Sequence, residues 1–240
     1  MMIKRERYLE EIRKVVGKQV IKVLLGMRRV GKSTLLLQIQ EELLTQGVEK
    51  EQIISLNFEW LEFESLKEYK VLYEYIESKK VNGKKSYVFL DEVQEVEGFE
   101  KVVNSLNSKG ETEVFITGSN SKLLSGELAT YLTGRFYTIE VLPLSYKEVS
   151  EGFLKTEDVF LEYLRTGGMP GKFQFEEDRT AKNYLMDMYQ SILLRDIVKR
   201  YNIRDVDLLQ RFMLYLINNI GQIFSAGTIT NYLKNEGRKL

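Results

Sequence analysis

Short apolar runs alternate with longer stretches of helical periodicity along the first part of the chain. Five runs are almost entirely apolar and are predicted to be strands: residues 20–25, 52–58, 86–91, 113–118 and 136–141. The stretches between them are predicted to be helices at residues 32–46, 66–79, 99–106 and 122–131. Apolar strands separated by helices are typical of a parallel sheet covered on both faces, so the predicted fold class is α/β.

The pattern changes near residue 144, beyond which the apolar spacing is helical. The predicted helices cover residues 159–165, 179–201, 205–220 and 226–234. Ser145 and Glu148 have the spacing of a capping box and predict one more helix, which starts directly after Pro143. We therefore expect two parts, an α/β core at residues 1–143 and a helical region at residues 144–240.

The charge balance gives no overall preference for a charged partner. The 240 residues include 35 basic and 35 acidic side chains, and 43% are hydrophobic, which suffices for a core. Contact with nucleic acid would therefore need a local basic patch. The start of the chain is too charged for a signal peptide, and no apolar run of about 18 residues occurs. We expect a cytoplasmic protein without a membrane partner.

Two residue types that dominate metal and acid–base chemistry are missing. The chain has no cysteine and no histidine, which excludes disulfides, thiolate metal sites and imidazole bases. Proton transfer would then fall to carboxylates. A bound metal would take oxygen ligands, as Mg²⁺ does.

One loop has the spacing of a phosphate-binding loop. Residues 26–33 read "GMRRVGKS", which fits G-x-x-x-x-G-K-[ST] between a predicted strand and a predicted helix. The glycines let backbone N–H groups surround a phosphate, and the positive end of the following helix faces the same anion. We expect Lys32 to bridge the β- and γ-phosphates and the Ser33 hydroxyl to bind Mg²⁺. The predicted nucleotide contacts are Gly26, Arg28, Arg29, Val30, Gly31, Lys32, Ser33 and Thr34. For the two arginines the alternative is a solvated side chain or a pair with a local carboxylate.

An acidic pair follows the third apolar run. In "YVFLDEVQ" the strand ends at Asp91, where a carboxylate at the carboxyl edge of the sheet reaches Mg²⁺ through water. Glu92 is placed to orient or deprotonate a water that attacks the γ-phosphate. ATP-hydrolysing machines use this pairing, whereas kinases exclude water. The structural alternative is an exposed acidic turn.

Small polar residues follow the fourth apolar run. Ser119 or Asn120 would lie beside the γ-phosphate if this strand inserts between the first and the third. There it would report the state of hydrolysis or hold the water, and Ser119 is a candidate catalytic residue. Ser119, Asn120 and Ser121 also suit a helix N-cap, and the two roles are compatible.

Six segments, taken in order, make the chain resemble a known family. They are "MIKRERYLEEI", "GMRRVGKSTLL", "FLDEVQ", "TGSNSKLLS", "LTGRFYTIEVLPLSYKEV" and "GGMPG". They resemble the AAA-type ATPase family of bacteria and archaea, whose members carry a P-loop core, a winged-helix region and a further domain of unknown function. The resemblance implies a P-loop NTPase fold of the additional-strand (ASCE) type, with five parallel strands in the order 5-1-4-3-2, and ATP as the ligand.

The resemblance also gives meaning to three further residues. Arg135 in "LTGRFY" precedes the fifth strand, where related ATPases place an arginine that reaches the γ-phosphate, in some cases on a neighbouring subunit. The alternative is a structural ion pair in a turn. Pro170 in "GGMPG" is similar to an element that packs on adenine in signalling ATPases, and the alternative is a turn that ends a helix. Asn57, at the tip of the second strand, is a candidate restraint on Glu92.

The end of the chain resembles the opening of a winged helix. A helix is expected to end near Gly221, and Ser225 is the predicted N-cap of the next. In a helix-turn-helix a further helix would read DNA, and the chain stops at Leu240 before it. Residues 144–240 are therefore expected to form a helical lid and an incomplete winged helix, in a truncated or a naturally short protein.

Together these observations predict a Mg²⁺-dependent ATPase of the AAA type that binds ATP. Candidate partners are another protein, DNA through a full-length winged helix, and further copies of the chain. The alternative is an ATP-dependent switch in which hydrolysis is slow and incidental. Glu92 and the lack of an arginine-rich lid argue against a small-molecule kinase, and the lack of an N-K-x-D element argues against a GTPase.

Overall fold

The structure is a computed structural model that describes residues 3–119, 134–152, 158–192, 197–198 and 201–235. It contains two compact units, Met1–Ala181 and Lys182–Leu240. Strands give way to helices near residue 144 as expected, but the helices from there to residue 181 belong to the same compact unit as the sheet. The division of the chain into domains at residue 144 stays a prediction.

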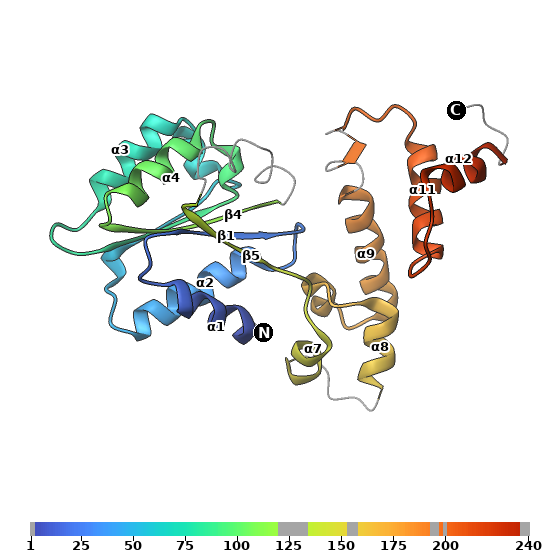
Figure 1. Ribbon diagram of the computed structural model, residues 1–240. Helices are drawn as coiled ribbons and strands as arrows, with labels where there is room; N and C mark the ends of the chain where they lie inside the picture. The colour runs from blue at the N-terminus through green and yellow to red at the C-terminus, as the bar shows by residue number, and fades with distance from the viewer. Residues whose placement is uncertain (1–2, 120–133, 153–157, 193–196, 199–200, 236–240) are drawn as a thin grey trace. The chain divides into compact units, whose positions relative to one another are not determined.

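The first unit is built on a sheet of five parallel strands (Figure 1). They are β1 (Ile21–Gly26), β2 (Ile53–Asn57), β3 (Ser86–Asp91), β4 (Thr112–Ser119) and β5 (Phe136–Glu140). Their order is β2-β3-β4-β1-β5, which confirms the predicted order. Every pair is parallel, so all five carboxyl ends lie at one edge of the sheet.

Helices cover both faces of the sheet. α1 (Glu6–Val15) and α2 (Lys32–Thr45) lie on one face, and α3 (Tyr69–Lys79) and α4 (Phe99–Ser108) lie on the other (Figure 1). Every residue of β1 is buried as a result, which explains why its sequence is apolar apart from Lys22. A continuous core joins the strands to α3 and α4 and includes Val23, Val88, Leu72, Ile76, Val102 and Leu106.

A capping side chain explains where α3 begins, and burial of an apolar face holds α1 in place. α3 starts at Tyr69, later than the predicted residue 66, because the Glu68 side chain accepts the N–H groups of Lys70 and Val71. A 3-10 turn, η2 (Leu61–Leu66), occupies the segment before it. α1 has no counterpart among the predicted helices, and it is held by burial of Tyr8, Leu9 and Ile12. The helix predicted at residues 122–131 lies outside the described residues.

The chain beyond β5 forms a small helical layer within the first unit. It contains α7 (Tyr146–Gly152), α8 (Val159–Thr166) and the 3-10 turn η4 (Pro170–Gln174). The predicted capping box is present, since Glu148 Oε2 accepts the Ser145 N–H at 2.8 Å and Ser145 Oγ accepts the Glu148 N–H at 3.3 Å. Leu144, Val149 and Val159 form its core.

The second unit consists of helices. α9 (Asp178–Ile192) leads into it, and α11 (Val206–Asn218) and α12 (Ala226–Asn235) follow. Ser225 caps α12 by accepting the Thr228 N–H at 3.1 Å, as the sequence predicted. The unit exposes Leu214, Ile217, Ile220, Ile223 and Phe224. In the described ranges, none of the helices has the length and apolarity that crossing a membrane requires.

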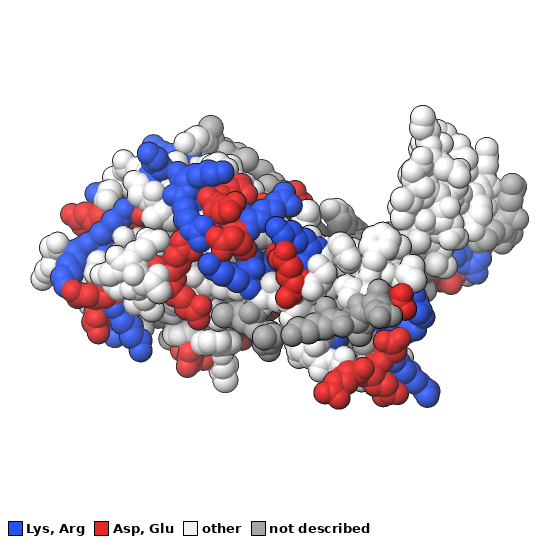
Figure 2. Space-filling model, turned by 90° about the horizontal axis from the view of Figure 1, so that it is seen from below, with Lys and Arg blue, Asp and Glu red and all other residues white. Residues whose placement is uncertain are grey.

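Opposite charges are interleaved on the surface of the first unit. Figure 2 shows basic and acidic side chains side by side on one face of this unit. In α1, for example, Arg13 pairs with Glu6 at 2.7 Å and also with Glu42 of α2. This arrangement agrees with the balanced charge of the whole chain.

A buried ion pair lies inside the sheet. Lys22 of β1 and Glu113 of β4 are 0% and 3% exposed and contact each other, and Lys85 approaches the second Glu113 oxygen at 2.7 Å. Burial lowers the pKa of Lys22. Burial acts in the opposite direction on Glu113, but hydrogen bonds from the two lysines outweigh it and lower the pKa of this carboxyl.

We expect Glu113→Gln to lower the free energy of unfolding by about 3 kcal/mol, because it leaves the Lys22 ammonium buried without its counter-charge. Urea denaturation followed by circular dichroism measures the change. The matched control is Glu64→Gln, which removes the partner of Lys67 at the surface and should cost less than about 1 kcal/mol. Equal losses in both variants would contradict the role given to the buried pair.

Candidate nucleotide-binding site

Three adjacent strands end at one place on the edge of the sheet. β1 ends at Gly26, β3 ends at Asp91, and β4 runs between them with Ser119 level with Gly26. Ligands of open α/β sheets bind at this carboxyl edge. The glycine loop and the acidic pair, which are far apart in the sequence, are therefore combined in one site.

The loop between β1 and α2 depends on two glycines. A Cβ on Gly26 would lie 2.3 Å from the Val141 carbonyl oxygen, so a side chain there would displace the backbone after β5. Gly31 has a φ of 97°, in the left-handed region that glycine tolerates, and its carbonyl accepts the Leu35 N–H at 2.9 Å. These glycines hold the loop in a turn that leads directly into α2.

The other loop residues divide into buried and charged positions. Val30 is fully buried, and Thr34 lies in the first turn of α2. Arg28 and Arg29 each have an interaction partner within the chain, and Arg29 adopts a φ of 64°. The nucleotide contacts expected of these four residues stay predictions.

Lys32 lies within the turn of the loop. The residue is 4% exposed, and its Nζ donates to the carbonyl oxygens of Gly26 at 3.2 Å and Met27 at 3.0 Å. The same Nζ is 3.6 Å from Glu92 Oε1. The P-loop lysine and the second carboxylate of the acidic pair are thus direct neighbours.

Asp91 is held by hydrogen-bond donors from three elements. Asn57 of β2 donates to its Oδ2 at 2.9 Å, Thr117 of β4 donates to its Oδ1, and the Ser33 hydroxyl also bonds to this carboxyl. Burial raises the pKa of Asp91, and the hydrogen bonds from Ser33 and Thr117 oppose that rise. Ser33 and Asp91 together are the residues that could hold a hard cation such as Mg²⁺.

Glu92 turns the chain at the end of β3. It is 8% exposed, and its φ of 53° and ψ of 45° place it in the left-handed region, which is uncommon outside glycine. Its N–H donates to Thr117 Oγ1 at 3.0 Å, and its carboxylate contacts both Lys32 and the side-chain amide of Gln94. The restraint expected from Asn57 is directed at Asp91 instead, because β2 and β3 are paired with Asn57 opposite Asp91.

Two predicted catalytic residues, Ser119 and Arg135, are not among the described side chains that cluster with Lys32, Asp91 and Glu92. The Ser119 backbone lies beside Gly26, but its side chain, Asn120 and Ser121 lie outside the described residues. Arg135 precedes β5, and its carbonyl accepts the Ile21 N–H at the start of β1. Its guanidinium donates to Asn104 of α4 at 2.6 Å. Because β1 spans about 15 Å, Arg135 lies at the far edge of the sheet from the loop in its own chain.

The segment that contains Pro170 lies against the loop. Pro170 Cγ is 4.0 Å from the point where a Cβ on Gly31 would be. The Gly168 carbonyl accepts the Leu144 N–H at 2.8 Å, and a Cβ on Gly168 would lie 1.8 Å from the Leu144 carbonyl oxygen. The glycine is therefore required for this close approach. The adenine contact expected of Pro170 stays a prediction.

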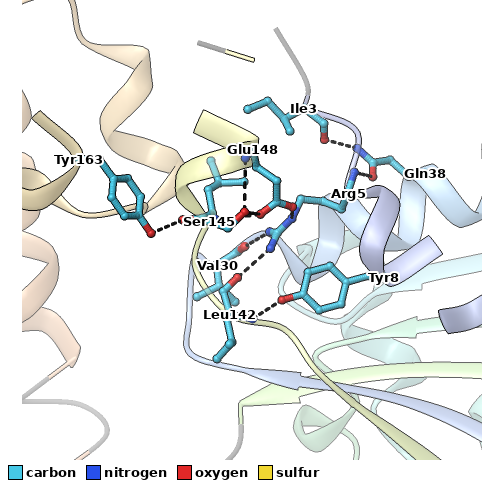
Figure 3. Close-up of polar contacts among 10 residues, drawn as sticks. Ile3, Arg5, Tyr8, Val30, Gln38, Leu142, Ser145, Glu148 and Tyr163 are labelled. Atoms are coloured by element: carbon cyan, nitrogen blue, oxygen red, sulfur yellow. Dashed lines mark hydrogen bonds and ion pairs between the residues drawn. The ribbon is translucent and has the colours of Figure 1, made fainter. Parts of the chain in front are cut away.

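Sequence reasoning missed three residues of this cluster. Thr117 is a polar residue that directly follows the apolar residues 114–116 of β4, and that interruption was a usable signal. Gln94 stands two positions after Glu92, but nothing local marks its side chain as a partner of that carboxylate. Arg5 donates to the Val30 carbonyl at 3.1 Å across a separation of 25 residues, which only the fold reveals (Figure 3).

This fold and this site define a P-loop nucleotide-binding protein. The family described as "AAA domain" matches residues 18–150, and a domain of unknown function, DUF8612, matches residues 157–238. The first match spans the sheet, the glycine loop and the acidic pair, and covers more than half of the chain. The chain belongs to the AAA-domain family, a family of nucleotide-binding ATPases.

The chain is also similar to uncharacterized proteins and to parts of solved structures. An uncharacterized protein of Haemophilus influenzae is 38% identical over 98% of this chain, and one of Methanocaldococcus jannaschii is 34% identical over 92% of it. The chain spans 60% and 51% of these two relatives. Similar solved structures include Saccharomyces cerevisiae Hsp104 in complex with casein (TM-score 0.46, 15% identity, 98% of this chain and 42% of that one). Another is Aeropyrum pernix ORC1 in complex with DNA (TM-score 0.45, 12% identity, 100% and 80%).

We expect Lys32→Ala to weaken ATP binding at least about tenfold, because a charge-assisted contact contributes about 1.5–3 kcal/mol. Calorimetric titration with Mg·ATP measures the affinity, and circular dichroism checks the fold. The matched control is Lys67→Ala, which also removes a lysine paired with a glutamate but lies at the surface. Unchanged ATP affinity in Lys32→Ala would exclude the loop as the nucleotide site.

Proposed function

We propose that this chain binds ATP together with Mg²⁺ and hydrolyses it. The observation that carries the proposal is the convergence of Lys32, Ser33, Asp91 and Glu92 at one edge of the sheet, with Lys32 Nζ 3.6 Å from Glu92 Oε1. A cation for phosphate, two oxygen ligands for a metal and a further carboxylate for water are the parts that phosphoryl transfer to water requires.

The phosphate-binding role follows from the loop. The Lys32 ammonium donates to the backbone carbonyls of Gly26 and Met27 and pairs with the Glu92 carboxylate. Phosphate oxygens are stronger acceptors for this ammonium than the two carbonyls are. The amino-terminal end of α2 adds the partial positive charge of its N–H groups. Lys32 thus holds and orients the β- and γ-phosphates.

The residues at the end of β3 fit a hard cation. Ser33 and Asp91 offer oxygen atoms that already face each other, and Asn57 and Thr117 fix the orientation of the carboxylate. Mg²⁺ bound there would neutralise charge on the transferring phosphoryl group. The surrounding donors keep Asp91 oriented when its hydrogen bond to Ser33 is exchanged for a metal contact.

Glu92 is the residue proposed to orient the attacking water. Its backbone conformation and its N–H bond to Thr117 fix the side chain's starting point beside Lys32. A carboxylate that accepts a hydrogen bond from water can align it with the γ-phosphate and take its proton. For that, the carboxylate has to leave at least one of its two partners, Lys32 or Gln94.

The same observation favours a second candidate, an ATP-dependent switch with slow turnover. While both partners hold Glu92, bound ATP would set a conformation without rapid hydrolysis, and a partner that displaces Gln94 would start turnover. The two consecutive helices α11 and α12, with the Ser225 cap between them, are compatible with the opening of a winged-helix region that contacts DNA or a protein. Steady-state phosphate release with and without DNA separates the two candidates.

A homo-oligomer with Arg135 acting between subunits completes the proposal. Arg135 lies at the far edge of the sheet from the loop of its own chain, where only a second copy could bring a γ-phosphate to it. An arginine that meets the γ-phosphate in the transition state accelerates hydrolysis by about 10³–10⁵.

We expect Glu92→Gln to bind Mg·ATP at least as well as the wild type and to lose about 10²-fold or more in turnover. The amide cannot accept the proton, and its neutrality removes a negative charge beside the phosphates. Asp91→Asn should instead weaken the Mg²⁺ dependence of binding. Phosphate release and calorimetry measure the two effects, with the exposed Glu97→Gln as control. Wild-type turnover in Glu92→Gln would show that another group handles the water.

We expect Arg135→Ala to bind ATP normally and to hydrolyse it poorly, and the wild type to gain activity per subunit as its concentration rises. Mixing Arg135→Ala with Lys32→Ala subunits should restore part of the activity, because one kind of interface then combines an intact loop with an intact arginine. Phosphate release from the mixture measures the rescue. If Arg135→Ala turns over normally at every concentration, the residue only anchors the turn before β5 to Asn104.

A further inference from the structure

Arg5 is a buried arginine that joins three parts of the first unit near the phosphate-binding loop (Figure 3). The residue is 3% exposed. Its Nη1 donates to the Val30 carbonyl at 3.1 Å, its Nη2 donates to the Leu142 carbonyl at 2.9 Å, and its Nε pairs with Glu148 Oε1 at 2.6 Å. The three acceptors belong to the loop, the segment after β5 and α7.

Contacts to both the backbone and the side chain of Arg5 fix its position. Its backbone N–H donates to Gln38 Oε1 of α2 at 2.9 Å, and its guanidinium lies over the ring of Tyr8 at 4.7 Å from the ring centre. The Tyr8 hydroxyl accepts the Leu142 N–H at 3.0 Å. Three acceptors in different directions require the planar fork of a guanidinium, which a lysine ammonium does not reproduce.

The bond to Val30 has a direct consequence for the loop. The peptide that joins Val30 to Gly31 is trans, so its C=O and its N–H point in opposite directions. Arg5 Nη1 donates to the Val30 carbonyl and lies 3.7 Å from the point where a Cβ on Gly31 would be. Fixing the carbonyl therefore orients the Gly31 N–H to the opposite side of the peptide, away from Arg5. In a phosphate-binding loop these N–H groups are the donors to the anion.

We propose that Arg5 is a positioning residue of the nucleotide site, which orients the Gly31 amide toward the phosphates and ties the loop to α7 through Glu148. The inference rests on the proposed nucleotide binding. Arg5 acts through the backbone, because its own positive charge is compensated by Glu148 and its donors are engaged by Val30, Leu142 and Glu148. Positioning by Arg5 would also couple the loop to the segment that contains Pro170. The hydrogen bond between Leu144 and Gly168 joins that segment to the start of the helical layer that contains α7 and Glu148.

The test compares Arg5→Lys with Arg13→Lys. Both changes keep the positive charge near α1, but Arg13 pairs with Glu6 and Glu42 at the surface. The probes are Mg·ATP and inorganic pyrophosphate, which reports the phosphate contacts without the base. We expect Arg5→Lys to weaken both affinities about tenfold, equivalent to about 1.4 kcal/mol, and Arg13→Lys to leave them unchanged. In ¹⁵N spectra, pyrophosphate should shift the Gly31 amide strongly in the wild type and weakly in Arg5→Lys.

A purely structural role predicts a different result. Folded Arg5→Lys would then bind pyrophosphate as the wild type does and show the same Gly31 shift, which would overturn this inference while the nucleotide site stands. A wild-type protein that binds neither ATP nor pyrophosphate would overturn the proposed function and this inference together.

If Arg5→Lys does not fold, Glu148→Ala and Glu148→Gln give the same comparison. Alanine removes one anchor of the guanidinium, whereas glutamine keeps an acceptor for Nε. The lost negative charge alone would strengthen anion binding in both variants. Weaker pyrophosphate binding confined to Glu148→Ala therefore supports positioning, and equal or stronger binding in both overturns it.

Discussion

The parallel register of β1, β4 and β3 is the constraint on which the site depends. Because all three strands run the same way, the loop after β1 and the acidic pair after β3 meet at one edge of the sheet. β4 lies between them and supplies Thr117, whose hydroxyl donates to Asp91 and accepts the Glu92 N–H. One hydroxyl inside an apolar strand thus fixes the orientation of both acidic residues. A buried polar group of this kind is tolerated because each of its bonds has a partner.

Charge compensation recurs at three buried ionic groups in the part of the chain that the structure describes. Lys22 faces Glu113 inside the sheet, Lys32 faces Glu92 in the loop, and Arg5 faces Glu148 beside it. An unpaired charge in such places would be costly, whereas a paired one holds its neighbours in a defined geometry. In the proposed function, Lys32–Glu92 is the one of these three pairs that meets competitors, since phosphates compete for the lysine and water for the carboxylate. The other two pairs stay closed and keep the framework rigid.

Much of the fold and the centre of the site could be predicted from the sequence. The five strands, their expected order, the capping box at Ser145 and the cap at Ser225 agree with the structure. Partners that depend on strand pairing could not be predicted in the same way. Asn57 was expected near Glu92 but lies opposite Asp91, because the register of β2 and β3 sets its neighbour. The distance of Arg135 from its own loop likewise follows from the parallel direction of β5.

The sequence by itself determined the features that rest on short-range chemistry. Glycines at two loop positions, a lysine and a hydroxyl at the start of a helix, and two carboxylates after an apolar strand identify the phosphate-binding loop and its acidic partner. Only the tertiary structure decided which side chains support them. Arg5 and Glu148 are 143 positions apart, and Gln94 bonds to Glu92 where the chain turns through a left-handed residue. Hydrogen bonds are short and directional, so partners distant in the sequence are set by the packing of the fold and by no local pattern.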